Sequence, residues 1–451
     1  MAMNKSLDEF VTFLAEARFE SVPSSVVEAA KDRLLDTIGA ALAALKADES
    51  IISARLVAEL GGAPEAVVIG RQQKAPCAHA AFANAVCAHA TELDDVHRAG
   101  ILHPGAVIVP AALAVAEKAG ADGRRLLLSI ILGYEVAIRA AKAVNPSHRA
   151  RGFHATGTCG TLGAAVAAAV NLGQGKATMG NTLALAASQA AGLLEFKEMT
   201  KRLNPGRAAF SGVLAALLAS RGFTGTVDVL DVGGRFFQAF SDAPRETDPY
   251  RGIGSSYQIL ESSIKLHSCC GYFHSAIDGV IKIMRTNNLA ATDIREIRVR
   301  TFANAMDGHL DPAPDTLVGA TMSMPYSVAA AACFGNASPA AFGGEARRDP
   351  LVRTVARRVR VEVSAAMESL FPGKWGAEVE IETTDGRVMT TTVDSPRGTF
   401  PGAPLSSEEL SDKFRRVSSE AVRGDVAERI ISVVRNIENA SSVRPLTSLL
   451  E

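Results

Sequence analysis

The sequence predicts a mainly helical protein, with a large all-helical domain built from both chain ends and a smaller α+β lid domain. Apolar residues recur at helical spacing through the first ~265 residues, and they alternate with polar residues at several places after residue 290. Helical spacing then returns after residue 404. We therefore expect residues 1–267 to form the helical domain, completed by residues 404–451, with residues 268–403 as the lid.

The helical part begins at a capping signal before an apolar run. Ser25 and Glu28 have the spacing of a capping box, and apolar residues follow at helical intervals. Four more stretches share this spacing and are rich in Ala and Gly, at residues 107–119, 124–144, 160–173 and 181–195. Side chains this small allow helices to pack with their backbones close together.

The lid is predicted from period-two patterns. Apolar residues alternate with charged ones at residues 297–301 and 359–363, which is typical of half-buried strands. Two alternating runs then flank Asp385-Gly386, a strong hairpin signal. Ser406 and Glu409 form a capping box that opens the returning helix.

The composition excludes several classes of function. The chain has 451 residues, 47% of them hydrophobic and 21% charged, with a net charge of -1. Without a basic excess we expect neither nucleic acid nor a membrane as partner. The first 20 residues lack the apolar run of a secretion signal, which favours a cytoplasmic protein. The six cysteines include no CxxC pair and are expected to be structural thiols, although the adjacent Cys269 and Cys270 leave a redox role open.

A polar stretch, "HATELDDVHRAGILHPGA" at residues 89–106, holds three imidazoles and three carboxylates. Such a cluster is typical of a metal site, an acid/base site or a polar loop between buried helices. A metal site would use His97, His103 and an acid, but the spacing matches no zinc or iron signature. His103 directly precedes an apolar helix, whose dipole would lower the pKa of the imidazole and attract an anion. The stretch therefore favours acid/base chemistry.

Three further stretches place basic and imidazole side chains beside apolar segments. They contain His154 before a Gly- and Thr-rich helix, Lys201 and Arg202 before an apolar helix, and Lys265, His267 and His274 at the junction with the lid. Each alone is compatible with a core or solvated position. Together they indicate a small, carboxylate-rich substrate. No nucleotide, pyridoxal or flavin motif is present, so no cofactor is expected.

These stretches resemble the MmgE/PrpD family, which contains 2-methylcitrate dehydratase, cis-aconitate decarboxylase and iminodisuccinate epimerase. The similarity runs nearly end to end, through "VPSSVVEAAKDRLLDTIGAAL", "HPGAVIVPAALAVAE", "GFHATGTCGTLGAA", "MTKRLNPGRAAFSG", "IKLHSCCGYFHSAIDG" and "MPYSVAAA". It implies a helical domain built from both chain ends, an α+β lid, a homodimer, and chemistry in the cleft that needs neither metal nor cofactor.

The resemblance also implies which residues form the pocket. By motif they are Glu92, Asp94, Asp95, His103, His154, Lys201, Lys265, His274 and Tyr326. On this reading Lys201 and Lys265 clamp substrate carboxylates. His103 and His154 move protons, and Tyr326 donates to an oxygen.

Two departures from the family pattern bear on the substrate. The family commonly reads Asp-Phe-Asp-Asp-Thr where this chain reads Glu-Leu-Asp-Asp-Val at residues 92–96, so one acid is longer and a hydroxyl is lost. We expect a cofactor-free lyase acting on a small di- or tricarboxylate, with 2-methylcitrate dehydration as the first expectation. Decarboxylation of the cis-aconitate type and epimerisation of the iminodisuccinate type are alternatives, and a catalytically silent binding protein of the same fold is another.

Overall fold

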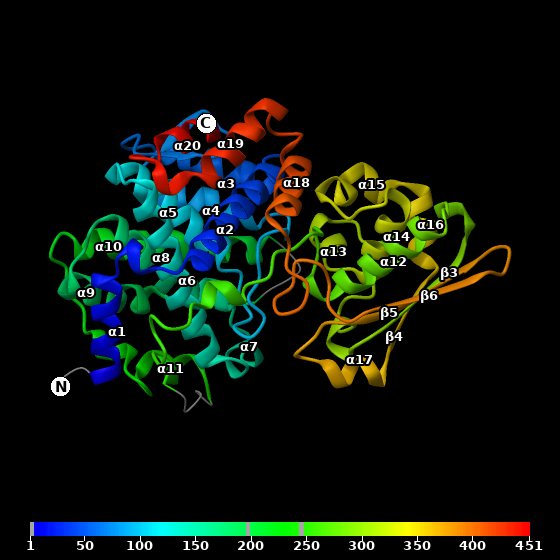
Figure 1. Ribbon diagram of the computed structural model, residues 1–451, viewed down its shortest axis with the longest axis horizontal. Coiled ribbons are helices and arrows are strands. Elements are labelled where there is room, and N and C mark those ends of the chain that lie inside the picture. The colour runs from blue at the N-terminus through cyan, green and yellow to red at the C-terminus, as the bar shows by residue number, and fades with distance from the viewer. Residues whose placement is uncertain (1–3, 195–198, 243–247) are drawn as a thin grey trace.

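The computed structural model describes residues 4–194, 199–242 and 248–451. Figure 1 shows a large helical body, coloured blue to green with red at the chain end, beside a smaller lid coloured green-yellow to orange. The helices of the body are α1 (Lys5–Glu16), α2 (Ser24–Ala43), α3 (Asp48–Leu60), α4 (Cys77–His89), α5 (Gly105–Ala119), α6 (Gly123–Val144), α7 (Ser147–Ala150), α8 (Ala155–Asn171), α9 (Lys176–Gln189), α10 (Thr200–Ala219), α11 (Arg235–Phe240), α18 (Ser407–Ser418), α19 (Gly424–Arg435) and α20 (Arg444–Thr447). The protein is mainly α, as predicted.

Small side chains let the central helices of the body approach closely. A Cβ atom on Gly163 of α8 would lie 2.7 Å from the backbone oxygen of Gly133 in α6. A Cβ atom on Gly212 of α10 would likewise meet the side chain of Ala164 at 2.6 Å. The Ala- and Gly-rich stretches therefore act as the sequence predicts, by bringing backbones together.

The last helices pack into the core formed by the first ones. One continuous apolar cluster contains Leu34 of α2 together with Phe414 of α18 and Ile430 of α19. A buried ion pair reinforces this contact, since Nζ of Lys413 lies 2.5 Å from Oδ1 of Asp36. Both chain ends thus contribute to the helical body, while the boundaries at residues 267 and 404 stay a prediction.

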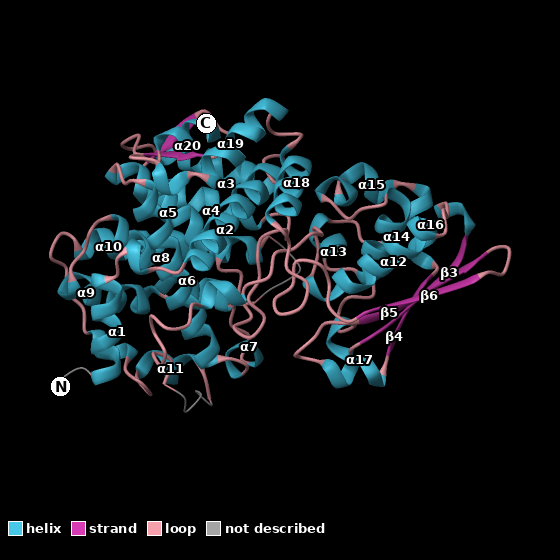
Figure 2. Ribbon diagram, viewed as in Figure 1, coloured by secondary structure: helices cyan, strands magenta, loops and turns pink. Residues whose placement is uncertain are grey.

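The lid has a separate apolar core and one mixed sheet. Its helices are α12 (His274–Thr286), α13 (Leu317–Thr321), α14 (Met324–Phe334), α15 (Gly344–Arg348), α16 (Pro350–Arg357) and α17 (Ala365–Leu370). Its strands, in the order β4-β3-β5-β6, are β4 (Val359–Val363), β3 (Ile294–Thr301), β5 (Ala377–Thr383) and β6 (Val388–Val393). Only the β3–β4 pair of this sheet is parallel. Figure 2 shows the strands of this sheet along the lower edge of the lid, with the β5–β6 turn projecting away from the body.

The predicted strands and hairpin are confirmed, and their core face is apolar. Ile297, Val299 and Ile381 are buried in the lid cluster. β5 and β6 pair in antiparallel register around the turn at Asp385-Gly386, where Gly386 has a φ of 84°. The capping box of Ser406 and Glu409 is also present.

Two details of the helical part differ from the prediction. A short antiparallel pair, β1 (Ala66–Val68) and β2 (Gln73–Ala75), interrupts the region expected to be all helical. The predicted capping box of Ser25 is absent, because α2 already begins at Ser24. Glu28 pairs instead with Lys31 at 2.8 Å.

A search of the described helices finds none that is long and apolar enough to cross a membrane. The six cysteines are free thiols.

Candidate active site

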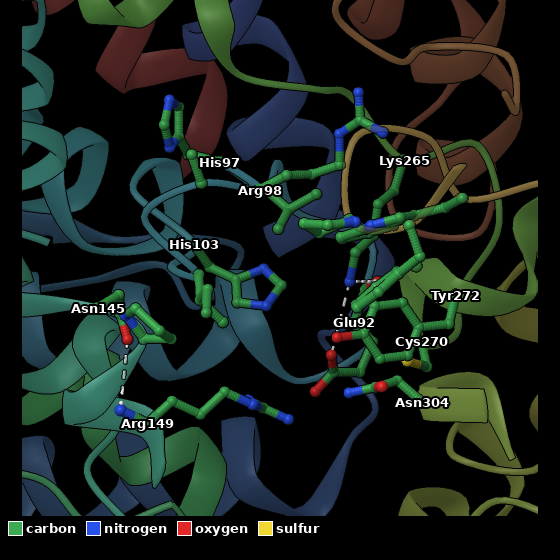
Figure 3. A pocket seen from close by; sticks show the side chains of 18 of the residues that line it. Glu92, His97, Arg98, His103, Asn145, Arg149, Lys265, Cys270, Tyr272 and Asn304 are labelled. Atoms are coloured by element: carbon green, nitrogen blue, oxygen red, sulfur yellow. Dashed lines mark hydrogen bonds and ion pairs between the residues drawn. The ribbon is translucent and has the colours of Figure 1, made fainter. Parts of the chain in front are cut away.

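A cavity of about 640 Å³ is lined by residues of both the body and the lid. The body contributes Glu92, His103, His154, Lys201 and Lys265. Five of the nine residues assigned from the sequence therefore face one cavity. Figure 3 shows it from close by, with the His103 ring pointing into it and Glu92 and Lys265 in contact.

Three helix starts, the loop at residues 90–104 and the non-helical segment that carries Lys265 position these side chains. His154 immediately precedes α8 and His103 lies two residues before α5, as the sequence predicts. The loop from residue 90 to 104 is held by a backbone bridge between Val96 and Ser263. Its end is fixed to α5 by Asp95, whose Oδ1 accepts from the backbone N–H of Gly105 at 2.8 Å. The predicted placement of Lys201 and Arg202 before their helix is wrong, since both lie in the first turn of α10.

Glu92 is the centre of a buried cationic cluster. Its Oε1 lies 2.5 Å from Nζ of Lys201 and 3.5 Å from Nη2 of Arg202. Its Oε2 lies 3.6 Å from Nζ of Lys265, which also donates to the backbone oxygen of Glu92 at 3.0 Å. Lys201 and Lys265, which were expected to bind substrate carboxylates, therefore already bind the carboxylate of Glu92.

Electrostatics keep Glu92 ionised in this buried place. Burial opposes ionisation, but the attraction of Lys201, His89, Lys265 and Arg202 holds the pKa of Glu92 well below its usual range. The pKa of Lys201 is lowered, because burial and the neighbouring cations outweigh the attraction of Glu92. A lowered pKa makes Lys201 easier to deprotonate than a surface lysine.

His103 is held as a neutral imidazole with one nitrogen free for the cavity. Its Nδ1 lies 3.0 Å from the backbone oxygen of Asp95, an acceptor that requires a proton on Nδ1. Nε2 therefore carries the lone pair. Burial lowers the pKa of His103 to about 4, even though the Asp94 carboxylate favours the charged ring. This geometry suits a general base.

His154 has the opposite tautomer. The amide of Asn204 donates from Nδ2 to the backbone oxygen of Leu193 at 2.9 Å, which fixes the orientation of the amide. The same nitrogen lies 2.9 Å from Nδ1 of His154, so Nδ1 accepts and Nε2 carries the proton. Burial, followed by the charge of Lys201, lowers the pKa of His154 well below its usual range. His154 thus presents a neutral N–H donor beside the His103 acceptor.

Asp94 links two imidazoles behind the cavity wall. Its Oδ2 lies 2.9 Å from Nδ1 of His89 and 3.4 Å from Nδ1 of His103. Burial opposes ionisation, but these two rings hold the pKa of Asp94 well below its usual range. His89 has no role that the sequence alone indicates, because its position at the end of α4 gives no signal of this contact.

The same three side chains are the metal candidate of the described residues. His89, Asp94 and His103 each offer a ligand atom, all within 4.8 Å of one another. However, Nδ1 of His103 is committed to the carbonyl of Asp95, so the group is better described as a hydrogen-bonded chain that orients His103. His97, the other metal candidate from the sequence, pairs with Glu261 at 3.2 Å and accepts from Gly100.

Asp95 supports the cavity wall and does not line the cavity. Its Oδ2 accepts from the hydroxyl of Tyr134 at 2.9 Å and lies 3.6 Å from Nε of Arg33. Burial raises the pKa of Asp95 to about 7, although Arg33 opposes this. It acts as the anchor between the loop and α5.

Two residues assigned by resemblance are not brought to the cavity. Tyr326 is buried in α14, and its hydroxyl donates to the backbone oxygen of Ala341 at 2.8 Å. His274 begins α12 and packs against the ring of His267, with 4.9 Å between ring centroids. Neither lines the cavity. The structure places both outside the lining of this cavity, and their contact with substrate stays a prediction.

The lid instead contributes residues that the sequence did not point to. Tyr272, Phe371 and Trp375 form an aromatic wall, in which the centroids of Tyr272 and Trp375 lie 4.8 Å apart. His309 adds an imidazole whose Nδ1 donates to the backbone oxygen of Met322 at 2.9 Å. On the body side, Arg149 and Asn145 also line the cavity. Tyr272 lies within the quoted stretch at residues 264–279, but the other residues lie far from it in the sequence, so only the fold brings them together.

Comparisons with known proteins agree with this architecture. The MmgE/PrpD N-terminal domain matches residues 8–247, and the MmgE/PrpD C-terminal domain matches residues 267–439. A cis-aconitate decarboxylase of Aspergillus terreus (strain NIH 2624 / FGSC A1156) is 28% identical over 458 residues, covering 96% of this chain and 93% of the relative. A human cis-aconitate decarboxylase is 27% identical over 471 residues, covering 100% of this chain and 95% of the relative. Because the two domain matches span most of the chain, it belongs to the MmgE/PrpD family.

Proposed function

We propose that this protein is a lyase that decarboxylates a small unsaturated di- or tricarboxylate of the cis-aconitate kind. The observation that carries the proposal is the cavity itself, which is lined together by His103 with its unprotonated Nε2, by buried lysines and by aromatic rings. Relatives named as cis-aconitate decarboxylases, which match nearly end to end, support this reaction over the 2-methylcitrate dehydration that we expected first.

The lysines and the aromatic rings of the cavity suit the two changes that decarboxylation requires, the growth of negative charge on carbon and the loss of charge from the departing carboxylate. The bond between carbon and the departing carboxylate breaks, CO₂ leaves, and the electron pair moves through the double bond to the carbon beside a retained carboxylate. Lys201 and Lys265 would stabilise the negative charge that develops there. A departing carboxylate placed against Tyr272 and Trp375 loses its charge as it becomes CO₂, which an apolar wall favours.

The carbon that gains the electron pair must then receive one proton, and His103 is the group we assign to deliver it. Burial keeps His103 neutral in the free protein. A bound polyanion favours the imidazolium, because a nearby negative charge raises the pKa of a histidine. Proton uptake on binding would thus place a proton on Nε2, facing the substrate. His154, with its Nε2–H, would hold a carboxylate oxygen.

The test is a turnover panel followed by proton NMR. The purified protein is incubated with cis-aconitate, glutaconate, 2-methylcitrate, citrate and iminodisuccinate. Loss of CO₂ with one solvent deuteron incorporated at carbon is expected for an unsaturated acid. Conversion of hydroxy acids alone would refute decarboxylation. Activity should persist after exhaustive chelation, because the proposal assigns proton transfer and charge stabilisation to side chains.

Dehydration is the second candidate, and one observation favours it. Elimination of water needs a base for the carbon proton and a donor for the leaving hydroxyl. The acceptor Nε2 of His103 and the donor Nε2 of His154 form such a pair. Alkene formation from 2-methylcitrate in the same panel would establish this reaction in place of decarboxylation.

We also propose that the protein is a homodimer, as the family resemblance implies. Light scattering after gel filtration should give twice the mass of the 47.2 kDa chain.

A further inference from the structure

The carboxylate of Glu92 lies where a substrate carboxylate would be clamped. Both lysines of the cavity contact it, Lys201 at 2.5 Å and Lys265 at 3.6 Å, and Arg202 approaches from behind at 3.5 Å. Glu92 itself lines the cavity, although only 1% of its surface is exposed. One anion of the protein therefore already engages both lysines that line the cavity.

The backbone holds Glu92 in this position. Its φ is +55°, a left-handed conformation that is uncommon for a residue other than glycine. The residue lies in the turn after α4, where its N–H donates to the backbone oxygen of His89 at 3.3 Å. Such a conformation persists only where surrounding contacts stabilise it, and here the contacts are the three cations.

We propose that Glu92 determines substrate specificity by taking the place of one substrate carboxylate, so that the cavity selects dicarboxylates over tricarboxylates. The inference rests on the proposed function, since it names the substrate class of the same site. A third carboxylate brought to Lys201 and Lys265 would meet the ionised Glu92 at close range, where like charges repel. A dicarboxylate leaves this place to Glu92 and binds elsewhere in the cavity, where the Nε2–H of His154 is a donor.

Glutarate and tricarballylate are suitable probes, because they differ by a single carboxylate. Both are saturated and carry no hydroxyl, so neither can undergo the proposed reactions. Calorimetric titration of the wild-type protein should give the tighter binding for glutarate. Glu92→Gln keeps the size of the side chain and removes its charge. It should increase the affinity for tricarballylate by roughly 10-fold to 100-fold, because the lysines gain a charge-assisted contact with substrate. The affinity for glutarate should change much less.

Glu261→Gln is the matched control. Glu261 is another carboxylate of the cavity, but it pairs with His97 and Lys142, each at 3.2 Å, and not with the two clamping lysines. Its removal should leave the ratio of the two affinities unchanged. If Glu92→Gln does not fold, Glu92→Asp keeps the charge and withdraws it from the lysines by one methylene. It should shift the ratio in the same direction by a smaller factor.

Tighter binding of tricarballylate by the wild-type protein would overturn the inference. So would an unchanged ratio of affinities in the Glu92 variants. Binding is measured without turnover, so a protein that prefers glutarate yet converts no acid of the panel would refute the proposed function alone. A protein that decarboxylates cis-aconitate and binds tricarballylate more tightly than glutarate would refute this inference alone.

Discussion

The two walls of the cavity differ in kind. The wall formed by the helical body carries Glu92, His103, His154, Lys201 and Lys265. Among the described lid residues that line the cavity, none is Asp, Glu, Lys or Arg. The body places its groups at helix termini and in two loop segments, whereas the lid presents rings that pack on one another. The proposed function therefore assigns proton transfer and charge stabilisation to the body, and shape and a low dielectric to the lid.

Replacing the base of the body wall should have the largest effect. His103→Asn keeps a similar size but cannot exchange protons near neutral pH, so kcat should fall by ~10²-fold to 10⁴-fold with less effect on KM. Steady-state kinetics measure both. His97→Asn is the control in the same loop, since His97 is engaged with Glu261 and Gly100. Equal losses in the two variants would assign the loop a structural role only.

The pH dependence of kcat/KM provides a second test of the role of His103. The pKa of His103 is about 4 in the free protein, so the acid/base limb of kcat/KM is expected near pH 4 and not near 6.5. If neutral His103 acts as base in a dehydration, kcat/KM falls as the pH drops through this limb. If protonated His103 is required for decarboxylation, kcat/KM falls as the pH rises above it. The direction of the limb therefore distinguishes the two candidate reactions, and it should vanish in His103→Asn.

How far the sequence could predict this site follows from where each residue lies. His103 and His154 were predictable, because each stands just before a helix with a clear apolar pattern. Lys201 was predicted as a pocket residue because it is basic and lies beside apolar segments. It was expected in a loop before the helix, since Pro205 inside that helix is typical of a loop. The family motif pointed to Tyr326, but the fold directs its hydroxyl to Ala341. Whether a side chain at a given position faces a cavity depends on tertiary packing that local patterns do not contain.

Most of the fold was predictable, because helices and strands leave local patterns in the sequence. The alternation of apolar and polar residues predicts strands such as β3 and β5, and the turn at Asp385-Gly386 fixes the register between β5 and β6 locally. The pair β1 and β2 was missed because each strand has only three residues, too few for a period to be visible. The aromatic wall was missed because Tyr272 and Trp375 are about a hundred positions apart and meet only in the folded lid.

Removing one cation from the body wall should have the next largest effect. Lys201→Met keeps most of the volume and leaves Glu92 with Lys265 and Arg202, so kcat/KM should fall by roughly 10-fold to 100-fold. Removing one partner of a buried pair also destabilises the fold, which thermal unfolding will detect. Adding Glu92→Gln should restore part of the lost stability. A fully active, fully stable Lys201→Met protein would contradict the assignment of charge stabilisation to Lys201.

A change in the tautomer of His154 should reduce kcat by a smaller factor. In Asn204→Asp the new carboxylate accepts where Asn204 donated, so the proton of His154 moves to Nδ1 and the cavity loses an N–H donor. We expect a roughly 10-fold loss in kcat, at the lower end for a single hydrogen-bond donor at a reacting charge. Nitrogen-15 NMR of the imidazoles reports the protonated nitrogen directly. If the spectrum shows no change of tautomer while activity falls, Asn204 acts through packing alone.

The smallest effect is expected on the lid side. The guanidinium of Arg98 lies 5.3 Å from the centroid of the Trp375 ring, and its Nη2 donates to the backbone oxygen of Phe400 at 2.7 Å. Trp375→Leu keeps an apolar surface but removes the cation–π contact, which is worth about 0.5–1 kcal/mol at an exposed site. We therefore expect KM to rise by roughly 2-fold to 5-fold while kcat stays nearly constant. Trp375→Phe, which retains an aromatic face for Arg98, should recover most of the wild-type KM. A loss in kcat as large as that of His103→Asn would contradict the proposed difference between the two walls, because the lid would then act on the reacting atoms themselves.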